Sequence, residues 1–148
     1  MFIFFLGPDC SGKDLLMHEL SRTINYKYFM SPRSPICNIV YDMIYRDVDF
    51  FDPITLNNIS LIGEFLKLGA YFILIDVDSH ILKKRAEEKG EKHVREVQDF
   101  DLHKKIYDQV FNDCIKRFIS YENRFIKITN NGEIYPVICE LRKRLNFD

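Results

Sequence analysis

The sequence predicts an α/β protein, in which a parallel sheet of about four to five strands is covered by helices on both faces. Three observations lead to this fold class. Strand-like and helix-like segments alternate along the chain, as in strands joined by crossover helices. The first strand-like run, 1–6, is continuously apolar, as expected for a strand buried on both faces. The length of 148 residues suits one domain with a substantial core, so we expect a single three-layer domain over 1–148.

The expected strands are short runs that are rich in aromatic and β-branched residues. After the first run, the clearest is 71–76, which ends in the carboxylate of Asp76. The second strand is predicted from the aromatic residues between Tyr26 and Met30. In chain order, the four expected strands are 1–6, 26–30, 71–76 and 124–129.

The expected helices have apolar residues three or four positions apart and turn residues at their ends. Asp52 and Pro53 have the residue types of a cap and a first helical position, and Gly69 is a stop signal. The expected helices are 13–22, 35–46, 53–68, one from a cap at Asp78 or Ser79 to Gly90, 100–120 and 134–145.

Composition excludes several classes of function. The formal net charge of −1 favours neither a nucleic-acid partner nor an anionic membrane surface. No run approaches the roughly 20 apolar residues of a membrane span, and the apolar run 1–6 is too short for the core of a signal peptide. The four cysteines are scattered without a C-x-x-C pair, which is typical of reduced thiols in a cytoplasmic protein.

A phosphate-binding loop is predicted between the first strand and the first helix. Residues 7–14 read Gly7-Pro8-Asp9-Cys10-Ser11-Gly12-Lys13-Asp14, which is close to the P-loop pattern G-x-x-x-x-G-K-[ST]. The two glycines allow backbone conformations in which N–H groups surround phosphate oxygens. The helix N-terminus adds partial positive charge, and Lys13 adds a full charge. We therefore expect ATP at this loop; the alternative is a loop that only caps the helix.

The metal ligand is the point where the loop departs from the pattern. Asp14 stands where a serine or threonine hydroxyl would face Mg²⁺. A carboxylate can bind Mg²⁺, although it also brings negative charge toward the phosphates. We predict Asp14 as the metal ligand. Asp76 is the alternative, because it ends an apolar strand as the metal-holding acid of many P-loop proteins does.

These motifs resemble the P-loop nucleoside and nucleoside-monophosphate kinases, and thymidylate kinase most of all. The loop GPDCSGKDL is similar to that family's G-x-D-G-x-G-K-T-T, with Asp9 at the acidic position that faces the sugar of the acceptor nucleotide. The segment 72–90, FILIDVDSHILKKRAEEKG, resembles the family's strand and lid helix. Arg85 falls on the first lid arginine, and Lys89 falls where the second is usual.

The resemblance also implies an acceptor region at about 31–68. Arg33 and Tyr41 match family residues beside the acceptor, while Pro32 holds the place of an acid. Arg33 would clamp the phosphate of the acceptor; the alternative is a hydrogen bond to a helix end. The chain is shorter than the family pattern, which has a further strand and crossover between the first helix and Arg33.

A lid is expected at about 83–97. Lys13, Arg85 and Lys89 are the cations that would neutralise the transferred phosphate. His93 and Arg95 would either close over the phosphates or belong to a surface loop. The alternative for the lysine-rich helix before them is an ordinary solvated surface with i,i+4 ion pairs. Five aromatic residues could stack on an acceptor base or belong to the core: Tyr41, Phe50, Phe51, Phe65 and Tyr107.

Two classes of function follow. The first is an enzyme that transfers phosphate from ATP, with Mg²⁺, to a (deoxy)nucleoside monophosphate, thymidylate first, or to a deoxynucleoside. Its catalytic residues would be Asp9, Lys13, Arg33 and Arg85. The second is a non-catalytic nucleotide-binding protein that keeps the fold, which the departures at Asp14 and the missing acid favour. The expected partners are nucleotide substrates, and the long helix 100–120 leaves a homodimer open.

Overall fold

A four-stranded parallel sheet forms the centre of the molecule in the computed structural model, which describes residues 1–90 and 99–147. The strand order is β2-β1-β3-β4, so the chain crosses over twice from the middle of the sheet to reach its edges. The strands are β1 (Phe2–Leu6), β2 (Phe29–Ser31), β3 (Tyr71–Asp76) and β4 (Phe125–Thr129), each parallel to its neighbours. The predicted α/β class, with all strands parallel, is confirmed.

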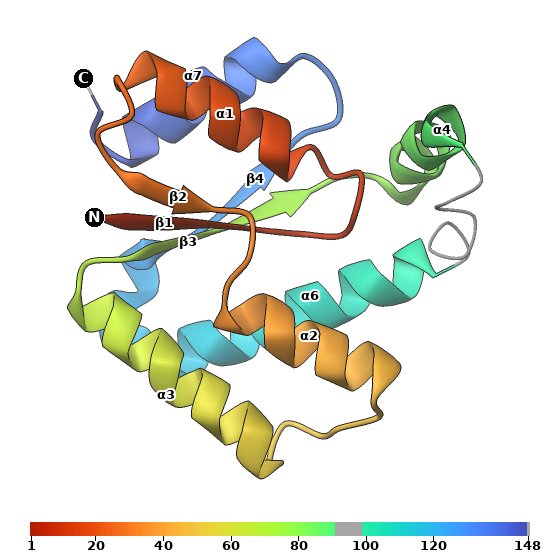
Figure 1. The fold of residues 1–148 in the computed structure, drawn as a ribbon, viewed down its shortest axis with the longest axis vertical. Helices are drawn as coiled ribbons and strands as arrows, with labels where there is room; N and C mark the ends of the chain where they lie inside the picture. The colour runs from red at the N-terminus through yellow and green to blue at the C-terminus, as the bar shows by residue number, and fades with distance from the viewer. Residues whose placement is uncertain (91–98, 148) are drawn as a thin grey trace.

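Helices cover both faces of the sheet (Figure 1). One face carries α1 (Lys13–Thr23) and α7 (Ile134–Arg144), and the other carries α2 (Pro35–Tyr45), α3 (Pro53–Lys67) and α6 (Phe100–Arg117). Helix α4 (Ser79–Lys89) lies beyond the end of β3, and a short 3₁₀ segment, Ile119–Arg124, joins α6 to β4. The molecule is therefore the three-layer arrangement that the sequence predicts.

The alternation of side chains along the central strands creates two cores. Ile3 and Phe5 of β1 face α1 and α7, whereas Phe4 and Leu6 face α2, α3 and α6. All four are at most 4% exposed, because the strand is covered on both sides. This explains why residues 1–6 read as a continuous apolar run without a polar alternation.

The observed boundaries differ from the predicted ones by more than one residue at two places. Strand β2 begins at Phe29 rather than at 26, because Asn25 and Tyr26 have left-handed backbone conformations (φ 53° and 54°) and prolong the turn after α1. Helix α6 ends at Arg117 rather than at 120, where the 3₁₀ segment begins. The aromatic residues correctly predict a strand in this region. They do not reveal that its first residues form a turn, because that turn contains no glycine.

The predicted end signals otherwise behave as expected. The Asp52 carboxylate accepts a hydrogen bond from Ile54 N at 2.9 Å at the start of α3. Gly69 and Gly90 take positive φ angles of 81° and 92° after α3 and α4. Asp78 occupies the cap position of α4, but its side chain makes no capping hydrogen bond.

Parallel strands bring four loops to the same edge of the sheet, where their carboxyl ends meet. These are the loop 7–12 after β1, the loop with Arg33 after β2, the start of α4 after β3, and Asn130 after β4. The motifs that the sequence singles out are thereby gathered from distant positions in the chain.

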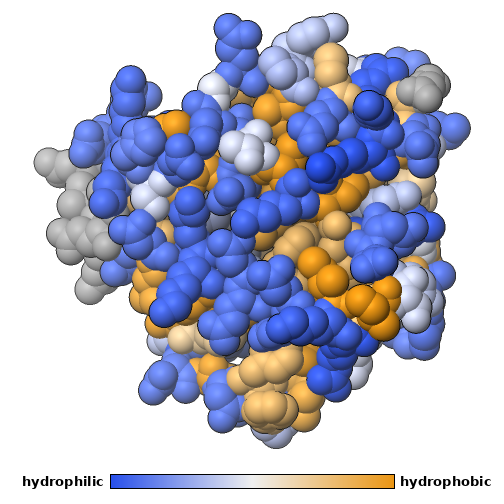
Figure 2. All heavy atoms as spheres, turned by 180° about the vertical axis from the view of Figure 1, so that it is seen from behind, coloured by the Kyte–Doolittle hydropathy of each residue, from blue (hydrophilic) through white to orange (hydrophobic). Residues whose placement is uncertain are grey.

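The outer surfaces of the helices are mainly polar. Seen from behind, hydrophilic side chains cover most of the molecule, and hydrophobic atoms show between them in smaller areas (Figure 2). Within the described ranges, no helix combines the length and the apolar character needed to cross a bilayer.

The stability of the sheet should depend on Phe72, which is fully buried and stacks between Phe4 and Phe125 at ring-centroid distances of 5.2 and 5.5 Å. Replacing Phe72 with alanine should lower the free energy of unfolding by about 3–5 kcal/mol, because it opens a cavity in a close-packed layer. Phe51→Ala is the matched control, since Phe51 is 78% exposed and should change stability by about 0.5 kcal/mol or less. Chemical denaturation of both variants measures the difference; equal effects would contradict this core.

Candidate functional site

The loop after β1 has the backbone of a tight phosphate cradle. Gly7 and Gly12 have φ angles of 145° and 84°, and Cys10 takes a left-handed conformation at φ 65°. A β-carbon at Gly12 would lie 2.6 Å from Asn130 Nδ2, and one at Gly7 would lie 2.9 Å from Ile75 O. Glycine is therefore required at both positions, because neighbouring atoms leave no room for a β-carbon and because the φ angles are positive.

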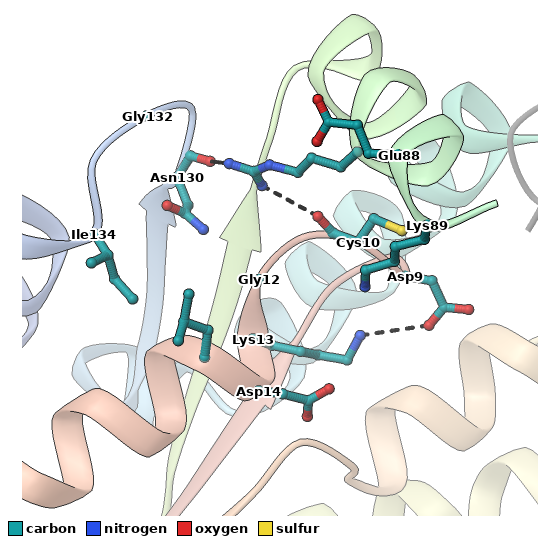
Figure 3. A pocket seen from close by; sticks show the side chains of 12 residues that line it. Asp9, Cys10, Gly12, Lys13, Asp14, Glu88, Lys89, Asn130, Gly132 and Ile134 are labelled. Carbon is teal, nitrogen blue, oxygen red and sulfur yellow. Dashed lines mark hydrogen bonds and ion pairs between the residues drawn. The ribbon is translucent and has the colours of Figure 1, made fainter.

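Two side chains from later in the sequence, those of Arg85 and Asn130, bond to this loop from outside; Figure 3 shows Asn130 beside it. Asn130 donates from Nδ2 to Ser11 O at 2.9 Å, and its own N–H donates to Asp76 O at 2.8 Å. Arg85 donates from Nη1 to Cys10 O at 3.2 Å and from Nη2 to Asn130 O at 3.0 Å. The phosphate loop, α4 and the end of β4 are thus tied together by one cluster of hydrogen bonds.

The direction of these bonds sets the direction of the loop's amides. In a trans peptide the C=O and the following N–H point opposite ways, and the chain has no cis bond among its described residues. Because Cys10 O and Ser11 O are held by Arg85 and Asn130, the N–H groups of Ser11 and Gly12 point away from those partners. The N–H of Ser11 donates to Pro8 O at 3.3 Å within the loop. Gly12 also precedes the first residue of α1, whose N-terminal partial charge favours an anion.

The amine of Lys13 lies beside the first residues of the loop. Its Nζ donates to Pro8 O at 3.2 Å and lies 3.7 Å from Asp9 Oδ1. Figure 3 shows Lys13 and Asp9 pointing toward one another, with Lys89 reaching in from α4. The side chain of Lys13 is 15% exposed, so its charge is held close to the backbone amides rather than in bulk water.

Two cavities meet at this lysine. The first is a cleft of about 600 Å³, and its charged lining residues are Asp9, Lys13, Asp14, Arg85, Glu88 and Lys89. The second is a pocket of about 160 Å³, lined by Asp9, Lys13, Asp14, Pro32, Arg33, Cys37, Tyr41 and Tyr107. Asp9, Lys13 and Asp14 line both, so one side of the loop faces each cavity.

The smaller pocket adds residues from α2 and α6 to those of the loop. Arg33 precedes α2 and is exposed, while Tyr107 of α6 is 3% exposed. Burial raises the pKa of the Tyr107 hydroxyl well above its ordinary value, and the neighbouring Cys37 and Tyr41 raise it further. Tyr107 therefore remains a neutral hydroxyl that can donate or accept a hydrogen bond.

The sequence-predicted residues fall into three groups. Every member of 9–14 except Ser11, together with Arg33, Arg85, Lys89, Tyr41 and Tyr107, lines one or both cavities. Phe65 instead packs against Phe2 and Phe4 in the core, and neither Phe50 nor Phe51 is among the residues that line the two cavities. The lid prediction for 91–97, with His93 and Arg95, lies outside the described residues.

The two carboxylates considered as metal ligands have different surroundings. Asp76 lies 3.5 Å from Lys104 Nζ and 4.0 Å from Lys127 Nζ, which occupy its carboxylate. Asp14 is exposed in the first turn of α1 and lines both cavities. The described ranges hold no cluster of three or more metal-ligating side chains. Mg²⁺ commonly binds through one or two carboxylates together with substrate phosphates, so Asp14 fits a phosphate-bound ion.

Sequence reasoning missed Asn130, which reads only as part of a turn. Its side chain is 5% exposed and bonds to a residue 119 positions earlier. The one available signal is its position directly after β4, because polar residues at the carboxyl ends of parallel strands gather at one edge.

Comparisons with known proteins support the fold. No protein-family model matches the chain, and no curated protein matches it. Among solved structures, the chain is similar to the YorR protein of Bacillus subtilis in complex with phosphorylated GDP, with a TM-score of 0.73 and 15% identity over 99% of this chain and 96% of that one. This likeness shows the fold alone, a parallel sheet covered by helices on both faces.

Two shikimate kinases are more distant. The one from Aquifex aeolicus has a TM-score of 0.49 and 16% identity, over 99% of this chain and 96% of that one. The one from Bacteroides thetaiotaomicron has a TM-score of 0.46 and 13% identity, over 99% and 98%.

Gly12→Ala should distort the loop 7–12. The added β-carbon would displace Asn130 and strain a positive φ angle, so we expect nucleotide affinity to fall roughly tenfold or more. Gly69→Ala is the control, because Gly69 also has a positive φ but nothing within 4 Å of an added β-carbon. It should lower stability by about 1 kcal/mol and leave affinity unchanged. Calorimetric titration with ATP decides; equal affinities in the two variants would refute the role of Gly12.

Proposed function

We propose that the chain is a P-loop kinase that transfers a phosphoryl group from ATP to a nucleoside monophosphate. The observation that carries this proposal is the position of Lys13, with Asp9 and Asp14, between the larger cleft and the smaller pocket. A protein that only binds a nucleotide needs one cavity at its phosphate loop. A transferase needs two, which meet where the phosphoryl group changes partners.

The proposed role of each residue follows from the cavity that it lines. ATP supplies the phosphoryl group and Mg²⁺ offsets its negative charge. The loop amides and Lys13 bind and orient the phosphates on the side of the larger cleft, with Lys89 as a second cation. Arg33 binds the phosphate of the acceptor in the smaller pocket, and Asp9 accepts a hydrogen bond from its sugar. Asp14 would hold the metal ion.

Arg85 has two parts in this proposal. Its bonds to Cys10 O and Asn130 O keep the loop in shape, and its guanidinium lines the larger cleft. Rotation of one N–H group from a carbonyl to a phosphate oxygen would allow it to stabilise the charge that develops during transfer. An arginine with this role can contribute roughly a thousandfold or more to turnover.

The acceptor is proposed to be a deoxynucleoside monophosphate, with thymidylate first because of the resemblance in the loop and lid helix. That the structurally similar YorR protein is found with phosphorylated GDP supports a nucleotide ligand in general. The second candidate is a non-catalytic nucleotide-binding protein. The observation that favours it is the carboxylate of Asp14, which faces the phosphate side without the hydroxyl of the usual pattern.

Incubation with ATP, Mg²⁺ and each nucleoside or monophosphate, followed by nucleotide chromatography, separates the two candidates. We expect a diphosphate product from at least one monophosphate. Lys13→Ala should reduce transfer roughly a hundredfold or more, because it removes a charge on the transferring group and leaves the loop backbone in place. Absence of product from every acceptor, with ATP binding retained, would favour the non-catalytic protein. Unchanged turnover in Lys13→Ala would contradict the proposed role of this lysine.

Asp14 should give the protein an unusual dependence on metal. If its carboxylate binds Mg²⁺, Asp14→Ala should weaken ATP binding in the presence of Mg²⁺ by about tenfold and strengthen it in the presence of a chelator. Asp14→Thr should recover the Mg²⁺-dependent affinity by restoring the usual hydroxyl ligand. Calorimetric titrations with and without Mg²⁺ measure both effects. An identical metal dependence in all three proteins would mean that Asp14 does not contact the ion.

A further inference from the structure

A third cavity continues from the smaller pocket into the space between α2 and α3. It has a volume of about 380 Å³, and its lining residues are Arg33, Asn38, Tyr41, Asp42, Arg46, Ile54 and Asn58. Arg33 and Tyr41 line this groove and also the smaller pocket. A molecule with its phosphate at Arg33 therefore has room to extend along α2.

The walls of the groove are polar at positions where two packed helices would ordinarily be apolar. Asn38 and Asp42 are four residues apart on α2 and face Asn58 of α3. Asp42 and Asn58 are each only 7% exposed. Burying a carboxylate and an amide between helices is costly unless hydrogen bonds compensate for the lost water.

Those side chains keep hydrogen-bonding capacity beyond their contacts within the protein. Asn38 donates from Nδ2 to Asn58 Oδ1 at 3.4 Å, which leaves its second N–H and its amide oxygen for a ligand. The Asp42 carboxylate has Oδ1 3.1 Å from Arg46 Nη1, and a carboxylate can accept several further hydrogen bonds. The ring of Tyr41, stacked on Tyr45 at 5.7 Å, supplies an aromatic wall beside them.

We infer that this groove holds the base of the acceptor nucleotide, and that Asp42 selects bases with a ring N–H, namely guanine, thymine and uracil, over adenine and cytosine. This inference rests on the proposed transfer function. An ionised carboxylate only accepts hydrogen bonds, so it pairs with the ring N–H of the first group. It repels the lone pair that adenine and cytosine carry at the corresponding ring nitrogen. Asn38 can donate to the adjacent base carbonyl.

The test compares transfer to dTMP, dGMP, dCMP and dAMP by the protein and by its Asp42→Asn variant. In the natural protein kcat/KM for dTMP or dGMP should exceed that for dCMP and dAMP by about a hundredfold. Asparagine can donate as well as accept, so the variant should reduce this ratio at least tenfold. Asp47→Asn is the matched control, because Asp47 is exposed outside the groove with a φ of 50° that asparagine tolerates. It should leave the ratio unchanged.

Because Asp42 is buried, Asn38→Asp provides an independent variant at an exposed position of the same groove. A carboxylate there would face a base carbonyl, so KM for dTMP should rise about tenfold while KM for ATP stays the same. Preference of the natural protein for dCMP or dAMP, or no change in base preference or KM in these variants, would overturn the inference and leave the transfer function intact. Transfer to none of the four acceptors would overturn the proposed function itself, and this inference with it.

Discussion

Two backbone carbonyls of the loop 7–12 point outward from the loop, and the geometry of the rest of the site depends on this orientation. Cys10 O and Ser11 O accept hydrogen bonds from Arg85 and Asn130, and this fixes which way the intervening amides point. The left-handed conformation of Cys10, a non-glycine residue, is unfavourable on its own, so the loop needs partners that hold it. Those partners come from α4, which follows β3, and from the residue after β4, because the parallel sheet brings the ends of β3 and β4 to the same edge as that of β1.

This arrangement connects folding to binding. Asn130 and Ser11 are 119 residues apart in the sequence. They come into contact only when β4 is paired with β3 and β3 with β1. The loop 7–12 is therefore held in shape only when β1, β3 and β4 have paired. The same contact explains why Gly12 must lack a side chain, since the amide of Asn130 occupies the space that a β-carbon would take.

The charges of the site are balanced rather than strongly positive. The larger cleft is lined by Lys13, Arg85 and Lys89, and also by the carboxylates of Asp9, Asp14 and Glu88. Such a lining does not attract phosphates by net charge alone, so in the proposed function oriented amides and a bound cation would supply the difference. An aspartate at position 14, in place of the usual serine or threonine, is compatible with phosphate binding if a divalent ion offsets the repulsion between the carboxylate and the phosphates.

Much of the fold could be predicted, because the signals were local: the apolar run of β1, the cap at Asp52 and the stop at Gly69 each depend on a few neighbouring residues. The start of β2 could not, because left-handed residues at Asn25 and Tyr26 have no distinctive sequence signal. The phosphate loop was evident from its spacing. Asn130 was not, since its role arises from a tertiary contact. Nor was the groove along α2, because Asp42 reads as an ordinary polar residue of an amphipathic helix until α3 is packed against it.

In the proposed function, two nucleotides meet end to end at Lys13. Calorimetric titration with a compound that joins adenosine to thymidine through a chain of phosphates, followed by displacement with each nucleotide, tests this arrangement. We expect one compound to bind per protein, more tightly than ATP, and to be displaced by both ATP and the acceptor monophosphate, because it occupies both cavities at once. Binding no tighter than that of ATP, or displacement by ATP alone, would contradict the placement of two nucleotides in the two cavities.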